Sequence, residues 1–101
     1  MLFRSTVLVI HVDFITGLPV TVEGYDAIMV VVDALTKYTI CCPCKKTYSA
    51  MDVAKMLMNE VFSVFGLPHK IISDKDIRFM NLVFDYIYEY YQIQMATTST
   101  N

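Results

Sequence analysis

The sequence predicts one α/β domain with a mixed sheet and the element order β-β-β-α-β-α-β. Hydrophobic residues make up 55% of the 101 residues and charged residues only 18%, so the chain has the composition of a folded core. Apolar residues have strand-like spacing in the first half of the chain and helical spacing in two later segments. The passages from strand to helix to strand imply crossover connections onto the same sheet.

Three strands are expected before the first helix. Residues 6–14 (TVLVIHVDF) are β-branched and apolar. Residues 27–32 (AIMVVV) form a continuous apolar run, which is typical of a strand buried on both faces. Residues 38–42 (YTICC) form the third strand, which we expect Pro43 to end. The short connections between these segments favour an antiparallel meander.

A helix is expected over residues 49–65. Ser49 and Asp52 have the spacing of a capping box, which also places an acid in the first turn. Gly66 stands where a C′ glycine belongs, and Pro68 prevents the helix from continuing. The residues that would form its apolar face are Ala50, Ala54, Leu57, Met58, Val61 and Phe65.

The elements after this helix are shorter. Residues 70–73 are expected to form a fourth strand, residues 81–91 a second helix and residues 92–97 a fifth strand, with no closing element before Asn101. The mean hydropathy of +0.47 is high, because a domain of this size buries a small share of its surface. We therefore expect either an apolar surface that contacts a partner or an incomplete domain.

The bulk properties weigh against several classes of protein. A formal net charge of −2 weighs against a general nucleic-acid-binding surface, although local basic patches matter more than the total. No apolar run approaches the ~20 residues of a membrane-spanning helix, and the N-terminus lacks the pattern of a secretory signal. Cys41, Cys42 and Cys44 are an odd number in one cluster, which favours a reduced, intracellular setting.

Two aspartates end expected strands: Asp13 ends the first and Asp74 ends the fourth. If these strands are neighbours, the two carboxylates face each other where ligands gather in such sheets. Two close acids repel unless a cation bridges them, and Mg²⁺ often takes one or two carboxylates with phosphate oxygens completing its shell. The alternative is that both are solvated turn residues, which are common at strand ends.

Five motifs follow one another over nearly the whole chain: DFITGLP, VVVDALTKY, TYSAMDVA, GLPHKIISD and DIRFMN. Together they resemble the catalytic core of integrases from gypsy-type LTR retrotransposons. The resemblance implies an RNase H-like fold and DNA integration, in which transposon ends are processed at their 3′ ends and joined to target DNA. It makes Asp13 and Asp74 catalytic residues and ligands of Mg²⁺ or Mn²⁺. It also implies a nuclear location and a homodimer formed through the core.

The third acid of this family is a glutamate that follows the second aspartate by about thirty-five residues, so that three carboxylates share the metal ions. That position lies beyond Asn101. The resemblance therefore implies that residues 1–101 are a partial, C-terminally incomplete catalytic core. A second hypothesis is a catalytically inactive, transposon-derived remnant that binds nucleic acid or dimerises.

Three basic residues are the expected nucleic-acid contacts: Lys37, Lys75 and Arg78. Lys75 stands where the family often has arginine, and it keeps the positive charge. If DNA binds, each phosphate contact adds about one released counterion to the salt dependence of binding. The alternative is that all three are solvated surface residues.

A third hypothesis is a small redox or zinc protein, because Cys41 and Cys44 form a C-x-x-C pair. Zinc would need two more ligands, and the histidines on offer are His11 and His69. A redox pair normally opens a helix, whereas a polar segment follows this one. We therefore expect free thiols and a structural role for His11.

Other conspicuous residues are expected to be structural. Asp33 should end the second strand in a turn, and Glu60 should lie on the surface of the first helix. The tyrosines of the second helix favour core and rim positions over a base-stacking platform; they are Tyr86, Tyr88, Tyr90 and Tyr91.

Overall fold

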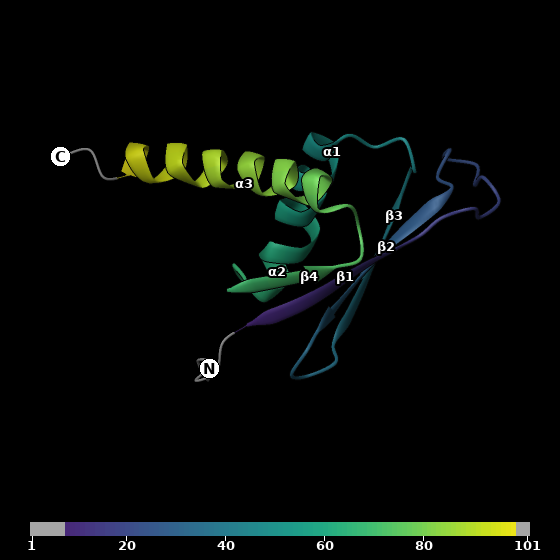
Figure 1. The fold of residues 1–101 in the computed structure, drawn as a ribbon, viewed down its shortest axis with the longest axis horizontal. Coiled ribbons are helices and arrows are strands. Elements are labelled where there is room, and N and C mark those ends of the chain that lie inside the picture. Colours follow the sequence, from purple (N-terminus) through teal and green to yellow (C-terminus); the bar gives the residue numbers. More distant parts are fainter. Residues whose placement is uncertain (1–7, 99–101) are drawn as a thin grey trace.

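The computed structural model describes residues 8–98, with the side chains of residues 8–91. These residues form a four-stranded mixed sheet whose helices pack on one face (Figure 1). The strands are β1 (Val9–Ile15), β2 (Ala27–Asp33), β3 (Thr39–Cys44) and β4 (Lys70–Ser73). Their order is β3-β2-β1-β4. The antiparallel meander of β1, β2 and β3 confirms the prediction, and β4 pairs parallel to β1 after a helical crossover.

The first helical segment is continuous over residues 50–65. It consists of α1 (Ala50–Met56), a π-helical stretch η1 (Leu57–Val61) and α2 (Phe62–Phe65). The Ser49 hydroxyl accepts a hydrogen bond from the Asp52 amide (3.3 Å), and the Asp52 carboxylate accepts one from the Ser49 amide (3.0 Å). This pair confirms the predicted capping box. Gly66 ends the segment with a φ of 87°, which glycine adopts without steric cost.

The hydrophobic core lies between the sheet and the helices. Fully buried side chains come from β1, β2, η1 and the last helix; they include Ile10, Val12, Met29, Val31, Leu57, Val61 and Val83. The apolar stripe predicted for residues 50–65 faces this core. Truncation of such a residue, for example Leu57→Ala, typically costs about 2–5 kcal/mol.

The opposite face of the sheet, here called the open face, carries no helix within residues 8–98 (Figure 1). Strand alternation places on it Val9, His11, Asp13, Ile15, Ile28, Val30, Val32, Thr39, Cys41, Pro43, Lys70 and Ile72. Ile15 is 47% exposed and Ile72 is 39% exposed. A sheet with one face in water normally alternates apolar and polar residues, and β2 does not. The sequence predicts burial of β2 on both faces, and the described chain covers one of them.

The last helix differs from the prediction. α3 spans Ile77–Thr98, so it begins before residue 81 and includes residues 92–97. The predicted fifth strand is therefore wrong. No glycine or proline interrupts the segment, so the helix propagates by adding one hydrogen bond per residue. Neither α3 nor any other helix within residues 8–98 is long and apolar enough to cross a membrane.

Two strand boundaries also differ. β3 continues through Pro43 to Cys44, whereas the sequence predicts that Pro43 ends the strand. β3 lies at an edge of the described sheet, and edge strands tolerate proline because one side of the strand needs no ladder donor. β1 begins at Val9 and ends one residue later than expected, and the expected start at residues 6 and 7 lies outside the described residues.

Candidate functional site

Asp13 and Asp74 each follow a residue of the last matched pair between β1 and β4. The parallel pairing matches Val9 with Lys70 and Val12 with Ser73, with one constant offset. The next position in this register is Asp13 in β1 and Asp74 immediately after β4. Paired strands lie about 4.8 Å apart, so the backbones that lead to the two aspartates are neighbours at this end of the sheet. The site prediction required these two strands to be neighbours, and the sheet order confirms that they are.

Both aspartate side chains are exposed, and Asp13 projects from the open face. The structure gives neither carboxylate a hydrogen bond or an ion pair with another described residue. Carboxylate oxygens are the ligands that Mg²⁺ and Mn²⁺ prefer, and two protein carboxylates with water or phosphate oxygens make a common Mg²⁺ shell. The donor set therefore fits such an ion. Across residues 8–98, no group of three or more acidic, histidine or cysteine side chains is placed to hold a metal.

Local hydrogen bonds shape the turn that carries Asp74. The Ser73 hydroxyl accepts a hydrogen bond from the amide of Lys75 (3.1 Å). The Asp76 carboxylate accepts one from the amide of Arg78 (2.7 Å), which caps the start of α3. The early start of α3 follows from this cap, because Asp76 satisfies an amide that a helix leaves without a partner.

Lys75 is half-buried, and its ammonium lies among aromatic rings. Its Nζ atom is 4.9 Å from the centre of the Phe14 ring and 5.2 Å from the centre of the Phe79 ring. The sequence predicts a phosphate contact for Lys75, which stays a prediction. The sequence alone does not identify these two rings, because they contact Lys75 only when β1 and α3 pack together.

The other two predicted DNA contacts lie at opposite ends of the sheet. Arg78 follows the Asp74 turn, is 91% exposed, and has its Nε atom 3.9 Å from Asp76. Lys37 lies in the turn between β2 and β3, next to the beginning of β1, because Ala34 donates to the carbonyl of Val9. Four residues along a strand span about 13 Å, so Lys37 is well separated from Asp13. Of the three basic residues, Lys75 and Arg78 accompany the aspartate pair and Lys37 does not.

Asp33 is confirmed as a residue that ends a strand in a turn. It is 1% exposed, and its Oδ1 atom accepts a hydrogen bond from the amide of Leu35 (2.9 Å) and one from Thr36 (3.4 Å). Its backbone carbonyl accepts a third from Lys37 (2.8 Å), which has a φ of 67°. These contacts bind the turn to the buried end of β2.

The cysteines do not form a redox or zinc pair. Cys41 is exposed on the open face, whereas Cys42 and Cys44 are buried on the helix-covered face. Cys41 and Cys44 therefore project from opposite faces of β3. Burial raises the pKa of Cys42 to about 11, with Glu60 adding to the rise, and burial also raises the pKa of Cys44. Raised values disfavour the reactive thiolate, and the opposite directions of Cys41 and Cys44 also weigh against a redox pair.

The two histidines also stay apart from the cysteines. His69 is paired with Leu8: its amide donates to the Leu8 carbonyl (2.8 Å), and its Nδ1 atom accepts from the Leu8 amide (3.2 Å). This contact joins the beginnings of β1 and β4. His11 is exposed on the open face, two residues before Asp13. A zinc site that combines them with the C-x-x-C pair is therefore excluded.

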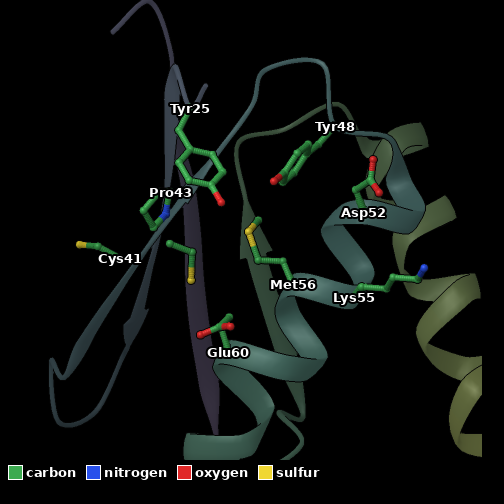
Figure 2. A pocket seen from close by; sticks show the side chains of 9 residues that line it. Tyr25, Cys41, Pro43, Tyr48, Asp52, Lys55, Met56 and Glu60 are labelled. Carbon is green, nitrogen blue, oxygen red and sulfur yellow. The ribbon is translucent and has the colours of Figure 1, made fainter. Parts of the chain in front are cut away.

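A cleft of about 400 Å³ lies between β3 and α1, away from the aspartate pair. Figure 2 shows the Glu60 carboxylate and the Tyr48 hydroxyl directed between the strand and the helix, and the Cys41 thiol directed away. Glu60 is exposed, as predicted. The cleft adds no carboxylate to the pair formed by Asp13 and Asp74.

Comparison with known proteins relates the chain to transposons. The Tf2-3, Tf2-4 and Tf2-5 transposon polyproteins of Schizosaccharomyces pombe are each 43% identical to it over 67 residues. The matched segment is 66% of this chain and 5% of each polyprotein. No family model matches the chain. The chain is therefore homologous to a small part of Tf2 retrotransposon polyproteins, which supports a transposon-related role.

Proposed function

We propose that this chain, which is homologous to a short segment of retrotransposon polyproteins, is part of the catalytic core of a gypsy-type integrase. Three features support the proposal. The five sequence motifs occur in the order of that family, and the mixed sheet with its β3-β2-β1-β4 order is compatible with an RNase H-like core. The third feature, on which the proposal mainly rests, is the position of Asp13 and Asp74 directly after the last matched pair of two parallel neighbouring strands, Val12 and Ser73.

The proposed chemistry is polynucleotidyl transfer, namely the processing of 3′ ends and their joining to target DNA. Bound Mg²⁺ or Mn²⁺ would stabilise charge on the phosphate and activate water or a 3′-hydroxyl. Asp13 and Asp74 would hold the ion, with remaining coordination positions open to phosphate oxygens. Arg78 is exposed on the first turn of α3 and would contact the DNA backbone. This role places the protein in the nucleus.

The number of carboxylates at the aspartate pair limits what residues 8–98 can do. No further acid joins Asp13 and Asp74 within residues 8–98. We therefore expect the 101-residue chain to bind metal and DNA and to join DNA ends weakly or not at all. Efficient joining by the purified chain, abolished by Asp74→Ala, would contradict this part of the proposal.

Metal-dependent DNA binding tests the proposal directly. A labelled duplex is titrated with the chain in Mg²⁺ and in EDTA, and the affinity is read from fluorescence anisotropy. Since DNA phosphate completes the metal shell, we expect tighter binding in Mg²⁺. Asp13→Asn and Asp74→Asn should each remove this difference, whereas Asp85→Asn, a change of another exposed aspartate, should keep it. Identical affinity in Mg²⁺ and EDTA for the unmodified chain would refute the proposal.

A second candidate is an inactive remnant that acts by dimerising, and the open face favours it. Its half-buried β2 residues and the exposed Ile15 and Ile72 form an apolar surface that no described helix covers. Sedimentation at increasing concentration would then show a dimer, and thermal stability would not respond to Mg²⁺. A monomer that is stabilised by Mg²⁺ would exclude this candidate.

A further inference from the structure

Lys75 lies in the turn that carries Asp74, yet it forms no ion pair with Asp74 or Asp13. Its Nζ atom instead lies 4.9 Å from the Phe14 ring centre and 5.2 Å from the Phe79 ring centre. Both distances are within about 6 Å, the range in which a cation is attracted to an aromatic ring. Phe14 belongs to β1 and Phe79 to the first turn of α3, so one side chain contacts both elements that flank the turn.

We propose that Lys75 is a positioning residue that holds Asp74 beside Asp13, an inference that rests on the proposed metal site. Phe14 follows Asp13 directly, and Lys75 follows Asp74 directly. The contact between Lys75 and Phe14 therefore joins the two backbone segments that carry the carboxylates. The contact with Phe79 also joins α3 to these two segments.

The Lys75 ammonium and the rings of Phe14 and Phe79, here called the anchor, lie on the face of the sheet opposite to the proposed metal site. Phe14 is half-buried and pairs with the buried Met29 on the helix-covered face, whereas Asp13 projects from the open face. Burial raises the pKa of Cys44, and the positive charge of Lys75 partly opposes the rise, which agrees with an ammonium near this buried face. Lys75 thus holds the turn without neutralising the carboxylates.

The anchor would oppose the electrostatic repulsion between the two carboxylates. Two carboxylates on adjacent strand positions repel when no cation lies between them, which favours movement of the turn that carries Asp74. The hydrogen bond from the Lys75 amide to the Ser73 hydroxyl fixes the turn locally, but does not connect it to β1. Of the contacts that Lys75 makes, the one between its side chain and Phe14 links the turn to the strand that carries Asp13.

The first measurement is the Mn²⁺ affinity of the 101-residue chain, obtained by electron paramagnetic resonance of the free ion. We expect Lys75→Met to weaken Mn²⁺ binding by about threefold to tenfold, the size expected from a partly buried cation–π contact. Lys75→Arg keeps a cation over the rings and should restore most of the affinity. Lys55→Met removes an exposed lysine from α1 and should leave the affinity unchanged. If Lys75→Met does not fold, Phe79→Leu replaces it, because leucine keeps an apolar side chain and removes the ring.

The second measurement is hydrogen exchange at the amides of residues 74–76 without metal. Exchange should become faster in Lys75→Met and return toward normal in Lys75→Arg. Unchanged Mn²⁺ affinity in Lys75→Met overturns the positioning role even if exchange becomes faster, because the lysine would then be only structural. If Asp13→Asn leaves Mn²⁺ binding intact, the proposed metal site itself is wrong. Loss of binding in Asp13→Asn together with normal binding in Lys75→Met would reject the positioning role alone.

Discussion

Ser73, the last residue of β4, pairs with Val12 of β1, so Asp74 and Asp13 each directly follow one residue of the last matched pair. In this arrangement two exposed acids, without any partner among the described residues, stand at the same end of a parallel strand pair. A structural turn has no need for two carboxylates in such a place, because like charges on adjacent strands destabilise a sheet. The proposed divalent cation would account for both the residue type and the position.

The first prediction concerns the stability of Asp74→Asn. Without metal, loss of one negative charge relieves repulsion with Asp13, and we expect the free energy of unfolding to rise by about 0.2–1 kcal/mol. With saturating Mg²⁺ the order should reverse, because the unmodified chain gains stability from ligand binding and the variant gains less. Thermal unfolding in EDTA and in Mg²⁺ measures both effects, with Asp85→Asn as the control. A variant that is less stable in EDTA would identify Asp74 as a structural residue.

The second prediction compares the DNA contacts of basic residues at the two ends of the sheet. Arg78→Ala removes an exposed cation beside the aspartate pair and should weaken DNA binding and lower its salt dependence by about one counterion. Lys37→Gly changes the distant turn and should affect DNA binding less. Because Lys37 has a φ of 67°, glycine should also raise the free energy of unfolding, by up to about 1 kcal/mol. Titrations at several salt concentrations and urea unfolding measure these effects; equal losses of DNA affinity would contradict the separation.

The third prediction concerns thiol accessibility. Iodoacetamide at neutral pH should modify Cys41, which is exposed on the open face, and should spare Cys42 and Cys44, which are buried. All three should react after unfolding in urea. Mass spectrometry of the intact chain counts the modified thiols, and Cys41→Ser should remove the modification in the folded state. Rapid modification of Cys42 in the folded chain would show that β3 does not pack against α1 as described.

The fourth prediction is a loss of stability at alkaline pH. Burial raises the pKa of Cys42 from 9.0 to about 11, with Glu60 adding to the rise. Since the folded state then holds this proton more tightly than the unfolded state, its contribution is complete below about pH 9 and is lost as the pH rises toward 11. Urea unfolding between pH 8 and pH 10.5, within the range set by these two values, should show the decline, and Cys42→Ala should make it less steep. Equal slopes for both chains would show that Cys42 does not titrate with folding.

Much of the fold can be predicted from local rules that relate neighbouring residues in the sequence. The capping box at Ser49 and Asp52, the C′ glycine at Gly66 and the alternating β1 each depend on neighbouring residues, and the structure confirms them. The sequence predicts the crossover from β3 to β4 but leaves open the place of β4 beside β1, which comes from the structure. Residues 92–97 could not be assigned in this way, because strand formation depends on a pairing partner that the local sequence does not specify.

The site was predictable in one respect and not in another. Asp13 and Asp74 both stand at strand ends, so the sequence brings them near each other only if their strands are neighbours, which the sheet order shows. The surroundings of Lys75 depend on how three separate elements pack, and a motif cannot show this. The sequence likewise groups Lys37 with Lys75 and Arg78 by charge. In the structure, Lys37 lies at the other end of the sheet from Lys75 and Arg78.

Nuclear magnetic resonance with Mn²⁺ tests the central claim most directly. The ion broadens the signals of nearby amides, so a titration of the ¹⁵N-labelled chain locates it without any assumption about activity. We predict that broadening is centred on the amides of Asp13 and Asp74 and is lost in Asp13→Asn. Broadening that is centred elsewhere, for instance near Asp52 and Glu60 in the cleft beside α1, or that persists in Asp13→Asn, would contradict the metal site and the function built on it.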